Sequence, residues 1–155
     1  MQENKSESGR SLVEIIGVMA IGGILMAALV ATYSTVRNRQ VRAIAAAQLE
    51  QIAKNTKLLM EHRHDYSGVS VDYLVKSGAL KNDKAPIGND EWSVTASIDG
   101  SEFSVNLKGL TKGECDYFTT AKLEWADRIK VNGFESNPET YCLTTGDNEV
   151  SFISK

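Results

Sequence analysis

The sequence is poor in the features that mark catalytic centres. Its 155 residues include two histidines, and its net charge at neutral pH is −3. It contains no glycine-rich phosphate loop, and no serine stands in a plausible arrangement with histidine and aspartate. Such a weak charge gives no reason to expect nucleic acid as a partner. We therefore expect a protein that is not an enzyme and that needs no cofactor.

Cysteine is also scarce, because only Cys115 and Cys142 occur. Their spacing is not that of a metal site. On the extracytoplasmic side of a membrane the two would be expected to form a disulfide, whereas in the cytosol they would stay free thiols. The residues alone leave both states open.

Charge is missing from one long segment. Residues 15–36 carry no charged side chain. As an α-helix they would span about 33 Å, close to the hydrocarbon core of a bilayer at about 30 Å. A lone carboxylate, Glu14, precedes them, and a carboxylate among apolar residues is expensive in lipid and calls for a partner. The rest of the chain is polar and mixed, which predicts a soluble domain anchored by a membrane helix.

Two ordinary interpretations of the N-terminus fit poorly. A cleaved secretory signal should begin with a basic region, but residues 1–9 carry a net side-chain charge of −1, and residues 27–31 offer no small-x-small cleavage site. A plain signal anchor would leave Glu14 without a role. A third interpretation accounts for it.

That interpretation comes from the segment GRSLVE, residues 9–14, and the apolar run that follows at once. The pattern resembles the processing site of type IV prepilins, possibly type IVb-like, and of the related pseudopilins. In that family a peptidase cleaves after the glycine on the cytoplasmic face and methylates the new N-terminal amine. The fifth residue of the mature chain is a glutamate. The resemblance implies a leader over residues 1–9, cleavage between Gly9 and Arg10, N-methylation of Arg10, and an assembly role for Glu14.

The chain departs from the family in two ways. Arg10 stands where the family usually has Phe, Met or Leu, and the apolar helix lacks the proline that many members carry. The basic residues Arg37, Arg39 and Arg42 also follow the apolar run, which by charge alone would favour a cytoplasmic C-terminal side. The resemblance implies the opposite orientation.

The resemblance further implies a homopolymeric filament. Glu14 would pair with the N-terminal amine of Arg10 on a neighbouring subunit, which offsets the penalty of burying either charge. Gly23, Ala27 and Ala31 form a stripe of small residues suited to close helix packing, although such residues are also common in membrane helices. The implied partners are the prepilin peptidase and the pilus assembly platform with its ATPase. The precursor would lie in the inner membrane and the product would be an extracellular pilus.

The helical pattern continues beyond the apolar run. Apolar or small side chains recur at steps of three and four residues, which predicts one helix from Ser11 to about Arg63. We expect a membrane or filament-core half over residues 10–36, an amphipathic half over residues 37–64 and a head domain over residues 65–155. The positions that recur are Val41, Ala45, Leu49, Ile52, Thr56 and Leu59.

The head should be a small α+β domain. Ser70 should cap a short helix over residues 71–76. Alternation predicts a hairpin of residues 92–98 with 103–107, with Trp92, Val94, Ala96 and Ile98 on one face. Residues 111–125 look partly helical, 128–131 read as a strand that ends at Asn132-Gly133, and 139–144 with 149–154 read as a final hairpin. A long N-terminal helix packed on a small antiparallel sheet is the type IV pilin fold, in which Cys115 and Cys142 resemble the family's disulfide pair.

Metal binding is not expected in the head. Asp147, Asn148 and Glu149 could supply oxygen atoms to calcium, as in some pseudopilins, but hairpin turns use these residues for backbone reasons. His62 and His64 would not share a helical face.

The sequence thus predicts a structural subunit of a type IV pilus. Two alternatives remain open. One is a pseudopilin or minor pilin of a secretion or DNA-uptake system, and the other is a bitopic membrane-anchored binding domain.

Overall fold

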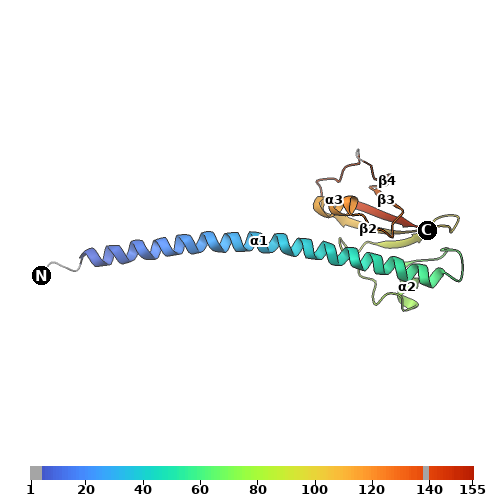
Figure 1. Cartoon of the computed structure of the whole chain (residues 1–155), viewed down its shortest axis with the longest axis horizontal. Coiled ribbons are helices and arrows are strands. Elements are labelled where there is room, and N and C mark those ends of the chain that lie inside the picture. Colours follow the sequence, from blue (N-terminus) through green and yellow to red (C-terminus); the bar gives the residue numbers. More distant parts are fainter. Residues whose placement is uncertain (1–4, 138–139) are drawn as a thin grey trace. The chain divides into compact units, whose positions relative to one another are not determined.

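The computed structural model describes residues 5–137 and 140–155. Its contacts divide the chain into two compact units, Met1–Gln40 and Val41–Lys155. The first helix runs through both units (Figure 1). In chain order the elements are α1 (Lys5–Met60), α2 (Val71–Lys76), β1 (Ser93–Ala96), β2 (Phe103–Leu110), α3 (Lys112–Thr120), β3 (Arg128–Val131), β4 (Phe134–Glu135) and β5 (Asn148–Ser154).

Helix α1 ends at Met60, three residues before the predicted end. The N–H of Arg63 donates to the carbonyl of Met60, and His64 adopts a left-handed backbone conformation with φ 54°. That conformation is incompatible with a continuing right-handed helix. The boundary is therefore set by a local turn that the hydrophobic pattern does not reveal.

The second half of α1 packs into the core of the head. The buried positions follow the predicted stripe in part, because Val41 and Leu59 are less buried than expected while Ala53 and Met60 are buried. Thr56 is fully buried, and its hydroxyl donates to the carbonyl of Ile52 at 2.8 Å, so its polar atom has a partner. The fully or nearly fully buried residues of this half are Ala45, Leu49, Ile52, Ala53, Thr56 and Met60.

The head contains one five-stranded antiparallel sheet, in the order β1-β2-β5-β3-β4. The hairpin of β1 and β2 is confirmed, with Val94 opposite Val105 and both side chains buried. Ile98, predicted on the same apolar face, is fully exposed instead. The N–H of Ser97 already bonds the carbonyl of Glu102 to close the turn, so the chain leaves the sheet before Ile98.

The predicted final hairpin is wrong. Residue 139 lies outside the described residues, and residues 140–144 form no strand. The last strand, β5, pairs instead with β2 on one side and β3 on the other. The short strand β4 pairs with β3 across the turn Asn132-Gly133, where the φ angles are 50° and 85°.

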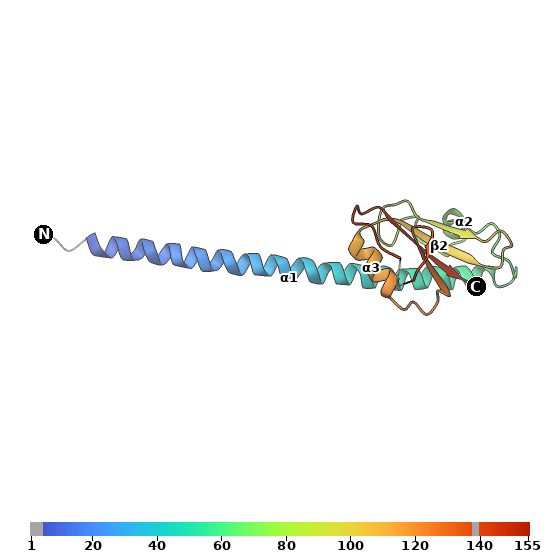
Figure 2. The same cartoon turned by 90° about the horizontal axis from the view of Figure 1, so that it is seen from above.

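Helix α3 contacts β5, the central strand of the sheet, and its two neighbours β2 and β3, and it lies beside the strands in Figure 2. It lies inside the segment predicted to be partly helical. Thr111 caps its N-terminus: the Thr111 hydroxyl accepts from the N–H of Glu114, whose carboxylate accepts in turn from the N–H of Thr111. Phe118 packs edge-to-face on Phe152 of β5, with ring centroids 5.7 Å apart. This aromatic contact fixes the helix on the sheet.

Candidate assembly site

The apolar half of α1 has no cover within the described chain. Among the described residues, α1 is the one helix that is long and apolar enough to cross a membrane. Its most apolar stretch has a mean hydropathy of 2.4, and no residue of that stretch is buried. Helices of this composition near an N-terminus also occur as signal sequences. The large exposed side chains include Leu12, Ile16, Met19, Ile24, Leu25 and Leu29.

Glu14 lies within this apolar surface. Its side chain is exposed, and it makes no hydrogen bond or ion pair with any residue that the structure describes. Its neighbours Val13 and Ile15 are exposed as well. Gly9 and Arg10, the predicted processing residues, lie in the helical backbone of α1, and the description does not extend to the Arg10 side chain. The carboxylate is therefore open to a group from outside the described chain.

The predicted packing stripe is equally uncovered. Gly23, Ala27 and Ala31 recur every four residues, so they share one face of α1. All three are exposed, and a Cβ atom placed on Gly23 would meet no described atom within 4 Å. Nothing in the described chain requires a glycine there.

Three hydroxyls in the apolar segment are satisfied by the helix itself, a feature the sequence interpretation missed. Thr32 donates to the carbonyl of Ala28, and Ser34 and Thr35 both donate to that of Ala31, at 2.8, 2.9 and 3.1 Å. Such bonds to the preceding turn hide the hydroxyl from an apolar environment. A serine or threonine inside a predicted helix, whose hydroxyl can reach the carbonyl three or four residues earlier, is the signal that could have indicated them.

In the head, Cys115 of α3 and Cys142 form a disulfide, the pairing that the resemblance implied. Their Cα atoms lie 5.9 Å apart, and 27 positions separate them in sequence. Cys115 is fully buried and Cys142 nearly so. The bridge ties the loop before β5 to α3.

Asn148 is the second anchor of that loop. Its side chain is buried, and its Nδ2 donates to the carbonyls of Leu110 and Leu143 at 3.1 and 2.9 Å. Its Oδ1 accepts from the N–H of Leu143 at 2.6 Å and from the amide of Asn132 at 3.2 Å. Of the three candidate calcium ligands, Asn148 therefore already uses its side-chain oxygen in hydrogen bonds within the head. No three His, Cys, Asp or Glu side chains among the described residues gather as metal ligands would.

A carboxylate organises the turn between β1 and β2. Asp99 accepts from the hydroxyls of Ser97 and Ser101 at 2.6 and 2.9 Å and from the N–H of Ser101. These bonds, that of Ser97 first, lower the pKa of Asp99 from 3.8 to about 2. Gly100, with φ 69°, is required beside it, because a Cβ there would lie 1.8 Å from the carboxylate of Asp65.

We expect this turn to lose stability in acid. A carboxylate whose pKa is lower in the folded state stabilises the fold above its unfolded pKa, and that contribution disappears as the pH falls from about 4 to about 2. The free energy of unfolding should therefore differ most between the wild type and Asp99→Asn above pH 4, and the difference should shrink towards pH 2. Asp147→Asn is the control, since that side chain makes no hydrogen bond within the described residues. A difference that does not change with pH would contradict the assignment.

Comparison with known proteins supports the fold. No protein-family model and no curated protein sequence matches the chain. Among solved structures, the chain is similar to the crystal structure of TcpA, a type IV pilin from the El Tor biotype of Vibrio cholerae, with a TM-score of 0.58 and 14% sequence identity. The match covers 75% of this chain and 99% of that one. The chain therefore has the type IV pilin fold, a long N-terminal helix with a small antiparallel sheet.

Proposed function

We propose that the chain is a structural subunit of a type IV pilus. Residues 10–36 would hold it in the inner membrane before assembly, and α1 would then polymerise it into an extracellular filament. The observation that carries the proposal is the combination of the pilin fold with an apolar helix whose surface nothing in the described chain covers. A soluble globular protein rarely leaves so large an apolar surface exposed, so a membrane or neighbouring copies must cover it.

The proposed processing follows the sequence motif. A prepilin peptidase removes residues 1–9 and methylates the amine of Arg10, and the assembly platform and its ATPase then extract the subunit. Intact mass spectrometry of the cell-associated protein tests this step. Loss of residues 1–9 plus one methyl group supports it. An intact leader would favour a bitopic anchored domain, while processing without an abundant surface filament would favour a pseudopilin or minor pilin.

Glu14 is the proposed assembly residue. An exposed carboxylate flanked by apolar side chains on both sides in sequence lacks a partner in the described chain. In a filament core it would be paired with the cationic N-terminal amine of a neighbouring subunit. Such a pair is stabilising only when both charges are present, because a lone buried charge is strongly unfavourable. The pair would also fix the axial register of the incoming subunit.

Glu14→Gln should therefore insert into the membrane but assemble poorly, with the yield of sheared surface filaments reduced by roughly tenfold or more. The measurement is the ratio of the protein in the sheared fraction to that in the membrane fraction, with electron microscopy of the former. Glu50→Gln is the matched control, since Glu50 is an exposed glutamate of the same helix within the head unit. A normal filament yield from Glu14→Gln would count against the proposed role.

A further inference from the structure

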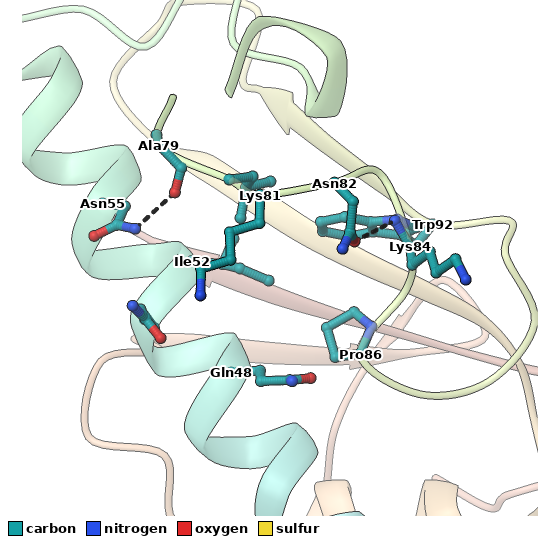
Figure 3. Close-up of a pocket in the computed structure, with 11 residues that line it drawn as sticks. Gln48, Ile52, Asn55, Ala79, Lys81, Asn82, Lys84, Pro86 and Trp92 are labelled. Carbon is teal, nitrogen blue, oxygen red and sulfur yellow. Dashed lines mark hydrogen bonds between the residues drawn. The ribbon is translucent and has the colours of Figure 1, made fainter. Parts of the chain in front are cut away.

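The head contains a polar cavity between α1 and the segment that connects α2 to β1 (Figure 3). It has a volume of about 260 Å³. One wall is formed by α1 and the other by residues 79–92, and Ile52 contributes an apolar floor. We call it the carboxamide cavity, after the four side-chain amides among its lining residues Gln48, Gln51, Ile52, Asn55, Ala79, Leu80, Lys81, Asn82, Lys84, Pro86 and Trp92.

Several side-chain amides of this cavity have no partner among the described residues and are accessible to a ligand. The amides of Gln48 and Gln51 make no hydrogen bond within the described residues. Asn55 donates through Nδ2 to the carbonyl of Ala79 at 2.8 Å, which leaves its Oδ1 as an acceptor (Figure 3). An unpaired carboxamide is both a donor and an acceptor. A ligand that uses both kinds of group therefore donates and accepts hydrogen bonds.

The charge at the cavity has one sign. Lys81 and Lys84 line it, and neither forms an ion pair with a described residue, whereas Lys76 and Lys112 each pair with an aspartate. No lining residue carries a carboxylate. The two ammonium groups favour a ligand with a negative charge.

Trp92 adds an apolar surface held in a fixed orientation. Its indole N–H donates to the carbonyl of Asp83 at 2.6 Å, and the ring is half-buried. In Figure 3, Trp92 and Pro86 lie on the connecting segment, on the opposite side from Gln48 and Asn55 of α1. The cavity thus presents amides on one side and apolar rings on the other.

We propose that the carboxamide cavity binds one residue of a carboxylated sugar. A sugar ring has an apolar C–H face for Trp92 and Pro86, hydroxyls that donate to and accept from the amides, and in a uronic acid one carboxylate for the lysines. Phosphate or an isolated carboxylate only accepts hydrogen bonds, so it could make no bond to the amide oxygens. The volume, just below the range of about 300–1,000 Å³ for drug-sized ligands, limits the site to one sugar residue.

This binding activity does not depend on the filament function. The cavity lies entirely within the unit Val41–Lys155 and uses no residue of the apolar half of α1. A chain that fails to polymerise should still bind the sugar, and a filament subunit could lack the activity. An experiment that refutes sugar binding therefore does not refute the filament function, and the reverse also holds.

The test uses the full chain in detergent micelles and follows its two tryptophan indole N–H signals by NMR. Trp92 lies at the cavity, whereas the indole nitrogen of Trp125 is buried elsewhere in the head. Glucuronate should shift the Trp92 signal in a saturable manner and leave that of Trp125 unchanged. Glucose, which lacks the carboxylate, should bind at least about tenfold more weakly, because charge-assisted hydrogen bonds are the stronger ones.

Two variants assign the contacts. Lys81→Met with Lys84→Met should abolish the preference for glucuronate over glucose, and Gln51→Leu should weaken both sugars. These side chains are exposed, so their replacement leaves the core intact. Lys122→Met with Lys130→Met removes the same charge from residues outside the cavity and should leave the affinities for glucuronate and glucose unchanged.

Three results would overturn the proposal. The first is a Trp92 signal that does not move with glucuronate at tens of millimolar. The second is equal binding of glucose, which would remove the role of the lysines. The third is equal binding of the α-amide of N-acetylglutamate, which would identify an acidic peptide, such as part of a second copy of the chain, as the occupant.

Discussion

Asn148→Ala should lower the free energy of unfolding by about 3–5 kcal/mol. The substitution removes four hydrogen bonds at once and orphans the N–H of Leu143 and the carbonyls of Leu110 and Leu143. Each buried group left without a partner costs about 1–3 kcal/mol, and the effects of neighbouring groups are not additive. The largest part of the loss comes from the carbonyl of Leu110, whose bond to the amide is buried, whereas Leu143 is exposed and water can reach its backbone groups.

Denaturant unfolding of the full chain in detergent, with the disulfide intact, measures this effect. Asn106→Ala is the matched control on the same sheet. Its Nδ2 contacts only hydroxyls, those of Ser93, Thr95 and Ser104, and its side chain is not fully buried, so we expect a loss below about 1 kcal/mol. Equal losses from the two variants would show that Asn148 has no special role.

The second large effect concerns the disulfide. Replacing both Cys115 and Cys142 by alanine should lower the free energy of unfolding by about 3–4 kcal/mol, since the bridge closes a loop of 27 residues in the unfolded chain. The unfolded state should also become less compact, so the dependence of the free energy on denaturant should steepen. A loss below about 1 kcal/mol, or an unchanged slope, would contradict this account.

The two anchors act on one segment, so their effects should be coupled. The disulfide holds Cys142, and the amide of Asn148 holds the next residue, Leu143, through both its N–H and its carbonyl. Once one anchor is lost, the loop is already less ordered, and loss of the other should cost less than it does in the wild type. The triple variant Cys115→Ala, Cys142→Ala, Asn148→Ala completes the double-mutant cycle.

Local signals in the sequence are sufficient to predict several helices and strands. The serine at position 70 predicts the start of α2, and its hydroxyl accepts from the N–H of Tyr73 as a helix cap should. Alternation predicts the hairpin of β1 and β2. Each of these depends on residues within a few positions of one another.

The features that the sequence did not predict depend on contacts between residues that are distant in sequence. Strand β5 has good strand character, but nothing in residues 148–154 indicates that β2 and β3 flank it rather than residues 139–144. The amide of Asn148, which reaches Leu110 across 38 positions, stabilises the preceding loop in a form that cannot pair. For the same reason the carboxamide cavity could not be predicted, because its walls come from residues 48–55 and 79–92.

Glu14 shows what the structure of a single chain cannot reveal. The sequence indicates that this carboxylate needs a partner, and the described chain contains none for it. A single copy of the chain cannot supply a contact made between copies. The role of Glu14 therefore stays a prediction that the filament yield decides.

The position of β5 also has a consequence for the order of folding. The other four strands form two hairpins that are local in sequence, β1 with β2 and β3 with β4, and β5 is the only described strand that joins them. Since β5 follows both hairpins in the chain, each can form early, but the sheet remains in two halves until residues 148–154 have been synthesised. Contacts so distant in sequence form slowly. A free peptide with the sequence of β5 should therefore be able to occupy the gap between the halves and stop the head from closing.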